Sequence, residues 1–305
     1  MTQSPTFQEK VSDNYAHKRP SSLKRWSRLL LRSKTGTVGF IIVLIVTFIA
    51  IFAPFLSPHD PAAINPAQML KPPFWMEGGS TANLLGTDNL GRDILSRILY
   101  GSQVSLLVGI TSVVVAGFIG VTVGLISGYF GGIIDNLLMR LVDSFLAIPT
   151  ILFSLVILSI FGPSVITLIV VLGATNWVNY ARLVRGEVLS IKERDFVRAA
   201  HSIGVKNSKI IVRHLLPNVI SSFIVISTLS VATTIILEAS LSFLGLGVQP
   251  PTVSWGTILS DGRDYLATSW WLATFPGIAI TITVLGIIFL GDWLRDVLDP
   301  RSKAK

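Results

Sequence analysis

The chain has 305 residues, of which 50% are hydrophobic and only 14% are charged, and its mean hydropathy is +0.66. This composition excludes an ordinary water-soluble fold and indicates a helical protein whose solvent is lipid. The absence of cysteine excludes disulfides and Cys-based metal sites. The net charge of +8 predicts no nucleic-acid partner, because the basic residues lie between apolar runs.

The N-terminal part predicts a cytoplasmic tail over residues 1–36 and a first transmembrane helix over residues 37–56. Residues 25–32 mix basic and apolar side chains as in an interfacial helix on membrane lipid, although a solvated tail remains open upstream of residue 20. We interpret the first span as a retained anchor, because 36 residues precede it and no small-residue cleavage site follows it.

Residues 57–103 predict an external loop, with five prolines in its first half. The stretch from Gly86 to Arg92 has the glycine spacing of a phosphate loop. However, Arg92 and Asp93 stand where that motif requires Lys and Ser or Thr. We therefore expect no ATP hydrolysis by this chain.

Residues 104–301 predict a permease core of five more transmembrane helices, over 104–126, 144–162, 163–181, 219–237 and 270–290. The third and fourth form one charge-free run of 38 residues. At about 1.5 Å per residue this run is roughly 57 Å long, so it must turn back. Gly162, Pro163 and Ser164 place the turn, and Pro149 is expected to kink the third helix.

The distribution of Lys and Arg orients these six spans. Of 25 such residues, 21 lie on one side if both termini are cytoplasmic, including the short tail 302–305. Only Lys71, Arg92, Arg97 and Arg263 would lie outside. The positive-inside rule favours this orientation over the inverted one.

A charged internal loop over residues 179–218 separates the fourth and fifth spans. It predicts a short amphipathic helix from Glu193 to Ser202, with Phe196, Val197, Ala200 and Ile203 on one face. Gly204 would end this helix, and a second helix would run from near Ser208 to Pro217. From these residues alone, an ordinary surface helix, a contact with anionic lipid and a partner-binding element all remain open.

The pattern of Ala199-Ala200, Gly204, Ile211, Leu215 and Pro217 resembles the EAA loop of binding-protein-dependent ABC importer permeases. In that family the loop forms a coupling helix that docks into a groove of a cytoplasmic ATPase. Arg198 stands where the motif has Glu. The resemblance therefore implies a coupling set made of the following residues: Glu193, Asp195, Phe196, Val197, Arg198, Ala199, Ala200, Gly204 and Pro217.

Further segments resemble the C-type subunit of the oligopeptide, dipeptide and nickel permeases. They are 85–93, 135–149, 241–256 and 291–301. The resemblance implies a type I ABC importer permease fold in the plasma (inner) membrane of a bacterium or archaeon. It also implies a second permease subunit, two cytoplasmic ATPases and an external binding protein that delivers peptide, with nickel or oligosaccharide as alternative substrates.

A few ionisable residues remain to be placed. Glu238, at the external end of the fifth span, could serve the transport pathway or cap and pair within the structure. Asp135 and Arg140 could form a local ion pair near the internal end of the third span. The chain offers no catalytic group, metal ligand set or cofactor site, and its span centres lack the charges expected of a secondary transporter.

Overall fold

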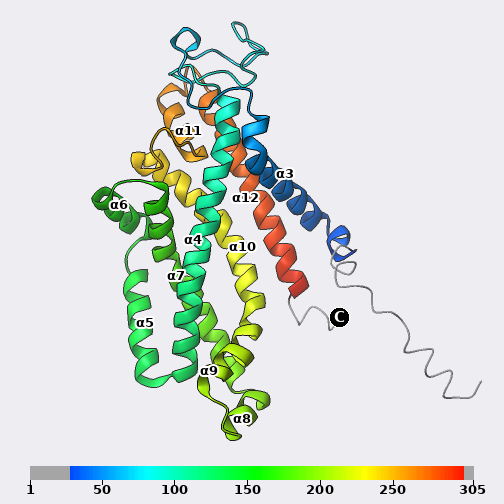
Figure 1. The fold of residues 1–305 in the computed structure, drawn as a ribbon, viewed down its shortest axis with the longest axis vertical. Helices are drawn as coiled ribbons and strands as arrows, with labels where there is room; N and C mark the ends of the chain where they lie inside the picture. Colours follow the sequence, from blue (N-terminus) through cyan, green and yellow to red (C-terminus); the bar gives the residue numbers. More distant parts are fainter. Residues whose placement is uncertain (1–27, 299–305) are drawn as a thin grey trace, which may run out of the picture.

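The computed structural model describes residues 28–298, and every regular element in this range is a helix (Figure 1). The tail over residues 1–27, the motif residues 299–301 and the tail 302–305 lie outside the described residues. Of the expected interfacial helix, only residues 28–32 are described, and they are helical.

Two long helices open the fold. Helix α3 spans Lys34–Leu56 and begins at Ser33, whose hydroxyl accepts a hydrogen bond from the Gly36 amide at 3.1 Å. Helix α4 spans Ile94–Phe130 and begins at Asp93, whose carboxylate accepts from the Ser96 amide at 2.8 Å. The expected external loop thus ends ten residues early, because the Asp93 cap starts the helix well outside the predicted span.

The third predicted span, residues 144–162, is wrong as a single helix. Helix α5 covers Gly132–Leu146 and helix α6 covers Thr150–Phe161, and the two are bent by 83° at the break. Pro149 lies at the N-cap of α6 and therefore marks this bend. With 12 residues, α6 is only about 18 Å long at 1.5 Å per residue, too short to cross a bilayer alone.

The turn at residues 162–164 is where the sequence predicts it, since α6 ends at Phe161 and α7 begins at Val165. Helix α7 then spans Val165–Lys192, well past the predicted end at residue 181. It leads into the short helices α8 (Asp195–Ser202) and α9 (Asn207–Ile210). The sequence from residue 179 onward therefore starts as helix rather than loop.

From α9 the chain continues through the wide turn η2 (Ile211–Leu215), helix α10 (Leu216–Leu241) and the wide turn η3 (Ser242–Leu246). Three further helical segments close the chain: α11 (Trp255–Gly262), η4 (Arg263–Tyr265) and α12 (Trp271–Leu298). Four stretches are long and apolar enough to cross a membrane, namely α3, α4, the run Asn207–Leu246 and α12, with bent α5 and α6 as a fifth candidate. Helix α7 is long enough to cross a membrane but is more polar than these stretches. Six crossings therefore remain a prediction.

Glycines allow α4 to pack closely against α7. A Cβ atom on Gly120 would lie 2.4 Å from the Trp177 carbonyl oxygen, and one on Gly124 would lie 2.7 Å from the Ala181 carbonyl oxygen. Such approaches exclude any larger side chain. These small residues on α4 therefore serve close helix packing.

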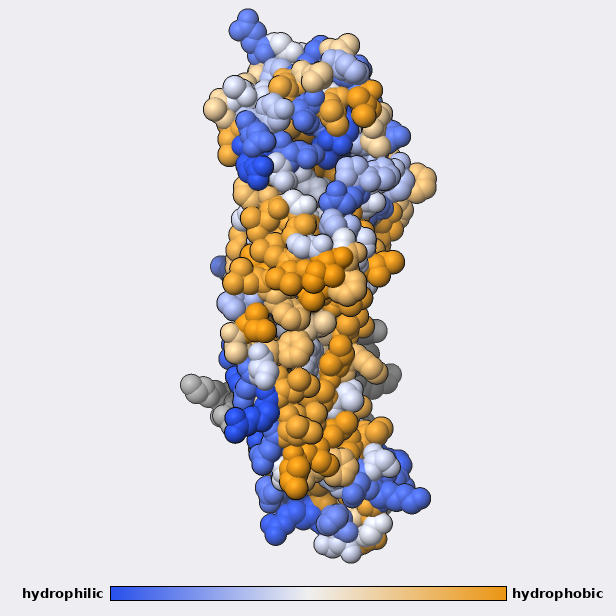
Figure 2. Space-filling model, turned by 90° about the vertical axis from the view of Figure 1, so that its left-hand side faces the viewer, coloured by the Kyte–Doolittle hydropathy of each residue, from blue (hydrophilic) through white to orange (hydrophobic). Residues whose placement is uncertain are grey.

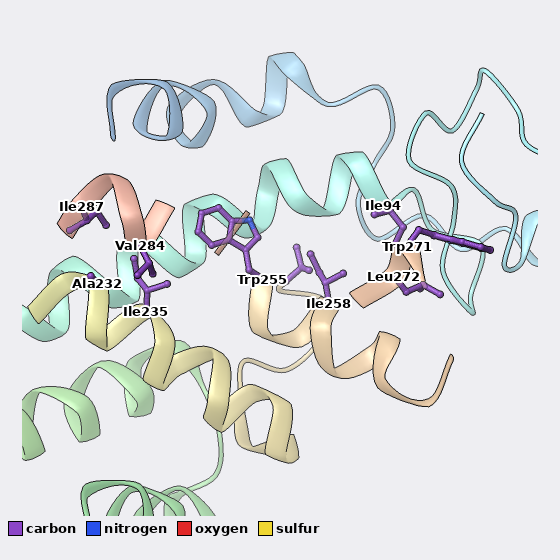
Figure 3. Close-up of a cluster of buried hydrophobic side chains, with 10 residues drawn as sticks. Ile94, Ala232, Ile235, Trp255, Ile258, Trp271, Leu272, Val284 and Ile287 are labelled. Carbon is purple, nitrogen blue, oxygen red and sulfur yellow. The ribbon is translucent and has the colours of Figure 1, made fainter. Parts of the chain in front are cut away.

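A cluster of buried hydrophobic side chains holds one end of the molecule together. Figure 3 shows Ile94 of α4, Ile235 of α10, Trp255 and Ile258 of α11 and Leu272 of α12 converging in it. The opposite end of the molecule is formed by α8 and α9 (Figure 1). Between the two polar ends, Figure 2 shows a belt of hydrophobic residues, as lipid exposure requires.

Candidate functional site

Helix α8 is the element that the sequence singles out, and it projects at one end of the molecule (Figure 1). The chain leaves α7 at Lys192, turns through exposed Glu193 and Arg194, and enters α8 at Asp195. The carboxylate of Asp195 lies in the first turn, where a negative charge interacts favourably with the helix dipole.

The inner face of α8 is anchored in the protein. Val197 and Ala200 are only 4% and 7% exposed and belong to an apolar cluster that includes Val184 and Val188 of α7. Leu215 of the returning arm joins the same cluster. These contacts tie α8 to α7 and to the arm that leads into α10.

Much of the outer face of α8 is uncovered within the described chain, although the ring of Phe196 lies 6.3 Å from that of His214. Phe196 is 42% exposed and Ile203 is 80% exposed, and Ala199 between them is also exposed. We call Phe196, Ala199 and Ile203 the docking face. The four apolar residues expected on one face of α8 differ in burial, because Val197 and Ala200 are buried whereas Phe196 and Ile203 are exposed.

Gly204 ends α8 as the sequence predicts. Its φ of +78° lies in the left-handed region that favours glycine, and nothing lies within 4 Å of where a Cβ would stand. The Gly204 amide donates to the His201 carbonyl at 3.0 Å, and the Val205 amide donates to the Ala200 carbonyl at 3.1 Å. These two bonds form a Schellman motif, which fixes the direction of the returning chain.

The returning arm joins α10 without a break. Pro217 lies in the first turn of α10, directly after the wide turn η2. Since proline has no N–H and its ring crowds the preceding turn, a locally widened helix is the expected accommodation.

Arg198, which stands where the motif has Glu, is exposed on α8 beside the docking face.

Ion pairs brace the arms of this loop. Arg185 of α7 forms a bidentate pair with Asp135 of α5, with distances of 2.6 Å from Nε to Oδ1 and 2.7 Å from Nη2 to Oδ2. Ser127 of α4 donates to the same carboxylate. The predicted pair of Asp135 with Arg140 is wrong, because residues five apart face different sides of a helix and Arg140 is exposed.

Glu238 lies at the far end of the molecule and is fully buried. Its Oε1 accepts hydrogen bonds of 2.7 Å from both Ser242 and Ser254, and its Oε2 lies 3.5 Å from the Ser105 hydroxyl. The carboxylate thus joins α4, α10, η3 and the N-cap of α11. This geometry supports the structural role of the two roles considered for Glu238.

A charged network that joins residues 88–97 to α11 was not predicted. Arg92 and Arg97 both contact Asp88, and their Nη2 atoms reach Asp261 Oδ2 at 3.1 and 2.9 Å. Asp88 is fully buried, and in this network the two arginines balance the charges of the two aspartates. The signal available in the sequence was a cluster of charges, Asp88 to Arg97, beside an apolar span.

Comparisons with known proteins bear on this arrangement. Residues 120–304 match the family described as the binding-protein-dependent transport system inner membrane component, and residues 21–73 match the N-terminal transmembrane domain of oligopeptide transport permease C. The chain belongs to the binding-protein-dependent transport permeases.

Curated relatives agree over nearly the full length. The chain is 40% identical over 284 residues to the di/tripeptide transport system permease DppC of Pseudomonas aeruginosa, covering 93% of this chain and 94% of the relative. It is 44% identical over 272 residues to the dipeptide transport system permease DppC of Escherichia coli K12, covering 89% and 91%.

A solved structure shows the same fold. The MetNI methionine ABC transporter in an inward-facing conformation has a chain that superposes with a TM-score of 0.56 at 21% identity, covering 68% of this chain and 98% of that chain. The protein is thus a multi-pass membrane permease with the type I ABC importer fold, and it is a transport subunit rather than an enzyme.

Proposed function

We propose that this permease is one of two homologous membrane subunits of an ATP-driven peptide importer. In this proposal both termini are cytoplasmic, the chain crosses the inner membrane six times, and two ATPase subunits bind on the side of α8. An external binding protein delivers substrate to the end that carries α11. The excess of Lys and Arg on the α8 side supports this orientation.

The two faces of α8 carry the proposal. The inner face is buried against α7 and the arm of α10, whereas the docking face is apolar and exposed. A helix with this arrangement can receive a partner and pass its displacement to the membrane helices. In the proposed mechanism, closure of the ATPases on ATP pushes α8 and tips α7 and α10 between inward-facing and outward-facing states.

The substrate class is proposed from the relatives, which are named as dipeptide and di/tripeptide permeases. Nickel and oligosaccharide remain the alternatives that the sequence resemblance left open. Selection among them is expected to rest with the external binding protein, because that protein presents the substrate.

Reconstitution of the complete transporter in proteoliposomes tests the function. With ATP inside and binding protein outside, uptake of labelled dialanine should depend on ATP, while Ni²⁺ and maltotriose should not accumulate. Uptake of dialanine that persists without ATP would favour a secondary transporter and contradict the proposal. Accumulation of Ni²⁺ or maltotriose in place of dialanine would overturn the substrate class alone.

A further inference from the structure

A continuous groove follows α7 and α10 on one side of the permease. A cavity of about 390 Å³ opens near the α8 end, and a second of about 560 Å³ lies next to it. The two share Leu183, Ile226 and Leu229 as lining residues, so they form one hollow, which we call the α7–α10 groove.

The lining of this groove mixes polar side chains with apolar ones such as Leu183 and Ile226. Asn179 and Arg182 of α7 line it together with Ser230 and Thr233 of α10. Asn179 is exposed, and its side-chain amide makes no hydrogen bond within residues 28–298. An amide such as that of Asn179, if it lies at membrane depth, faces water or another protein rather than hydrocarbon, because its hydrogen bonds would otherwise be lost.

Polar residues also explain why α7, although it has 28 residues, is not among the helices that are apolar enough to cross a membrane. Asn179, Arg182 and Glu187 of α7 line the groove, whereas Arg185 of the same helix points to Asp135 of α5. Gly186, directly before Glu187, is exposed, and nothing lies within 4 Å of where its Cβ would stand. The groove is therefore open along α7 down to its cytoplasmic part.

Glu187 is the ionisable group at the cytoplasmic part of the groove. Its carboxylate lies beside the Ser222 hydroxyl, while its Oε2 atom is buried with no hydrogen-bond partner in the part of the chain that the structure describes. Arg295 of α12 lines the same cavity. One cavity thus offers a carboxylate with spare bonding capacity and a guanidinium group.

We propose that the α7–α10 groove is this subunit's wall of the substrate path, and that Glu187 binds the α-ammonium group of a passing peptide. This inference rests on the proposed function for its ligand. A peptide carries one free ammonium and one free carboxylate, which are separated by roughly 7 Å in an extended dipeptide. Arg295 supplies the charge that suits the carboxylate end.

Thiol accessibility tests the groove independently of the ligand. The chain has no cysteine, so single-cysteine variants need no further substitution. In inverted vesicles containing the whole transporter, S230C should react with a cationic, membrane-impermeant thiol reagent. The matched control is V114C, because Val114 is 62% exposed on an apolar face of α4.

We expect S230C to react at least about tenfold faster than V114C, since a thiol in apolar surroundings keeps its proton and meets no reagent. Equal rates, or an unreactive S230C, would show that lipid or the partner subunit covers the groove and would overturn the proposal. As a second probe, Gly186→Leu should block uptake, because the added side chain enters the groove without meeting this chain.

Substitutions of Glu187 test the ligand. E187Q keeps the shape of the side chain and removes its charge, so uptake of dialanine per assembled transporter should fall roughly tenfold, as expected for loss of a charge-assisted hydrogen bond. E187D should restore most of the uptake. Glu77→Gln, at an exposed position of the external segment, should leave uptake unchanged.

The outcomes separate this inference from the proposed function. Uptake by E187Q within twofold of the wild type would refute the role of Glu187. Dialanine uptake with an unreactive S230C would refute the groove alone. Failure of the wild-type transporter to accumulate dialanine, with S230C still reactive, would refute the peptide ligand and leave the path intact.

Discussion

Placing aspartate at two adjacent positions of α8 separates anchoring from docking. Ala200 is 7% exposed and packs in the apolar cluster with Val184 and Val188, whereas Ala199 is exposed on the docking face. Ala200→Asp forces a carboxylate into that cluster, while Ala199→Asp leaves the anchor intact. Both substitutions change helix propensity equally, so the difference between them reports burial alone.

The expected difference is large. An unpaired charge left buried costs about 3 kcal/mol or more, which corresponds to a change on the order of 100-fold in the opening equilibrium of α8. Ala199→Asp, facing solvent, should change the same equilibrium by less than about threefold.

Hydrogen exchange of the α8 amides in the purified permease measures this effect. Ala200→Asp should lose nearly all protection in residues 195–202, whereas Ala199→Asp should keep it. In the complete transporter Ala199→Asp should nevertheless lower ATP-driven uptake, because it puts a charge in the docking interface. Equal protection in the two variants, or full uptake by Ala199→Asp, would refute the assignment of the two faces.

Three further predictions concern the membrane helices, each read from thermal stability of the detergent-solubilised permease. Gly120→Ala should lower the free energy of unfolding by about 1–3 kcal/mol, because the added methyl group overpacks against α7. The control Gly186→Ala should leave this free energy unchanged or raise it, since its Cβ meets nothing. A loss of stability in both variants would contradict the packing. Asp135→Asn should lower the free energy of unfolding by about 1–3 kcal/mol, because it breaks the bidentate pair with Arg185. The control Asp143→Asn breaks an exposed ion pair with Arg182 and should cost less than about 1 kcal/mol. Equal losses would argue against a bracing role of the Asp135 pair. Glu238→Ala should lower stability more than Glu238→Gln, since glutamine still accepts from the serines, and a harmless alanine would speak against a structural carboxylate.

The sequence predicted most of the membrane helices because long apolar runs are a direct property of composition. For the same reason the kink expected at Pro149 gave no sign that α5 and α6 would be two separate helices. The break between them contains apolar Ala147 and Ile148, so hydropathy continues across it and Pro149 was the single sign of a bend. A proline predicts a kink, but the angle of 83° depends on packing against other helices.

Helix α8 shows where periodicity stops being informative. An eight-residue helix with apolar Phe196, Val197, Ala200 and Ile203 has too few turns to define which stripe is buried. Packing against α7 decides the matter, because Val197 and Ala200 face the cluster and the other two do not. The position of Gly204, by contrast, was predictable, since the left-handed end of a helix favours one residue type.

Long-range ion pairs were beyond prediction from one sequence. Asp261 meets Arg92 from 169 positions away, and Asp135 pairs with Arg185 across two helices instead of with nearby Arg140. Local spacing limits which partners are possible on one helix, but tertiary contacts select among distant ones. These pairs therefore had to come from the fold.

Cross-linking from the docking face tests most directly whether α8 couples this permease to ATPases. A single cysteine at Ala199, in a chain that has no other, can be linked through a short thiol-to-amine reagent in the assembled transporter. We predict an adduct with one ATPase subunit from A199C and little adduct from buried A200C. No ATPase adduct from A199C, or equal yields from both positions, would contradict coupling through α8.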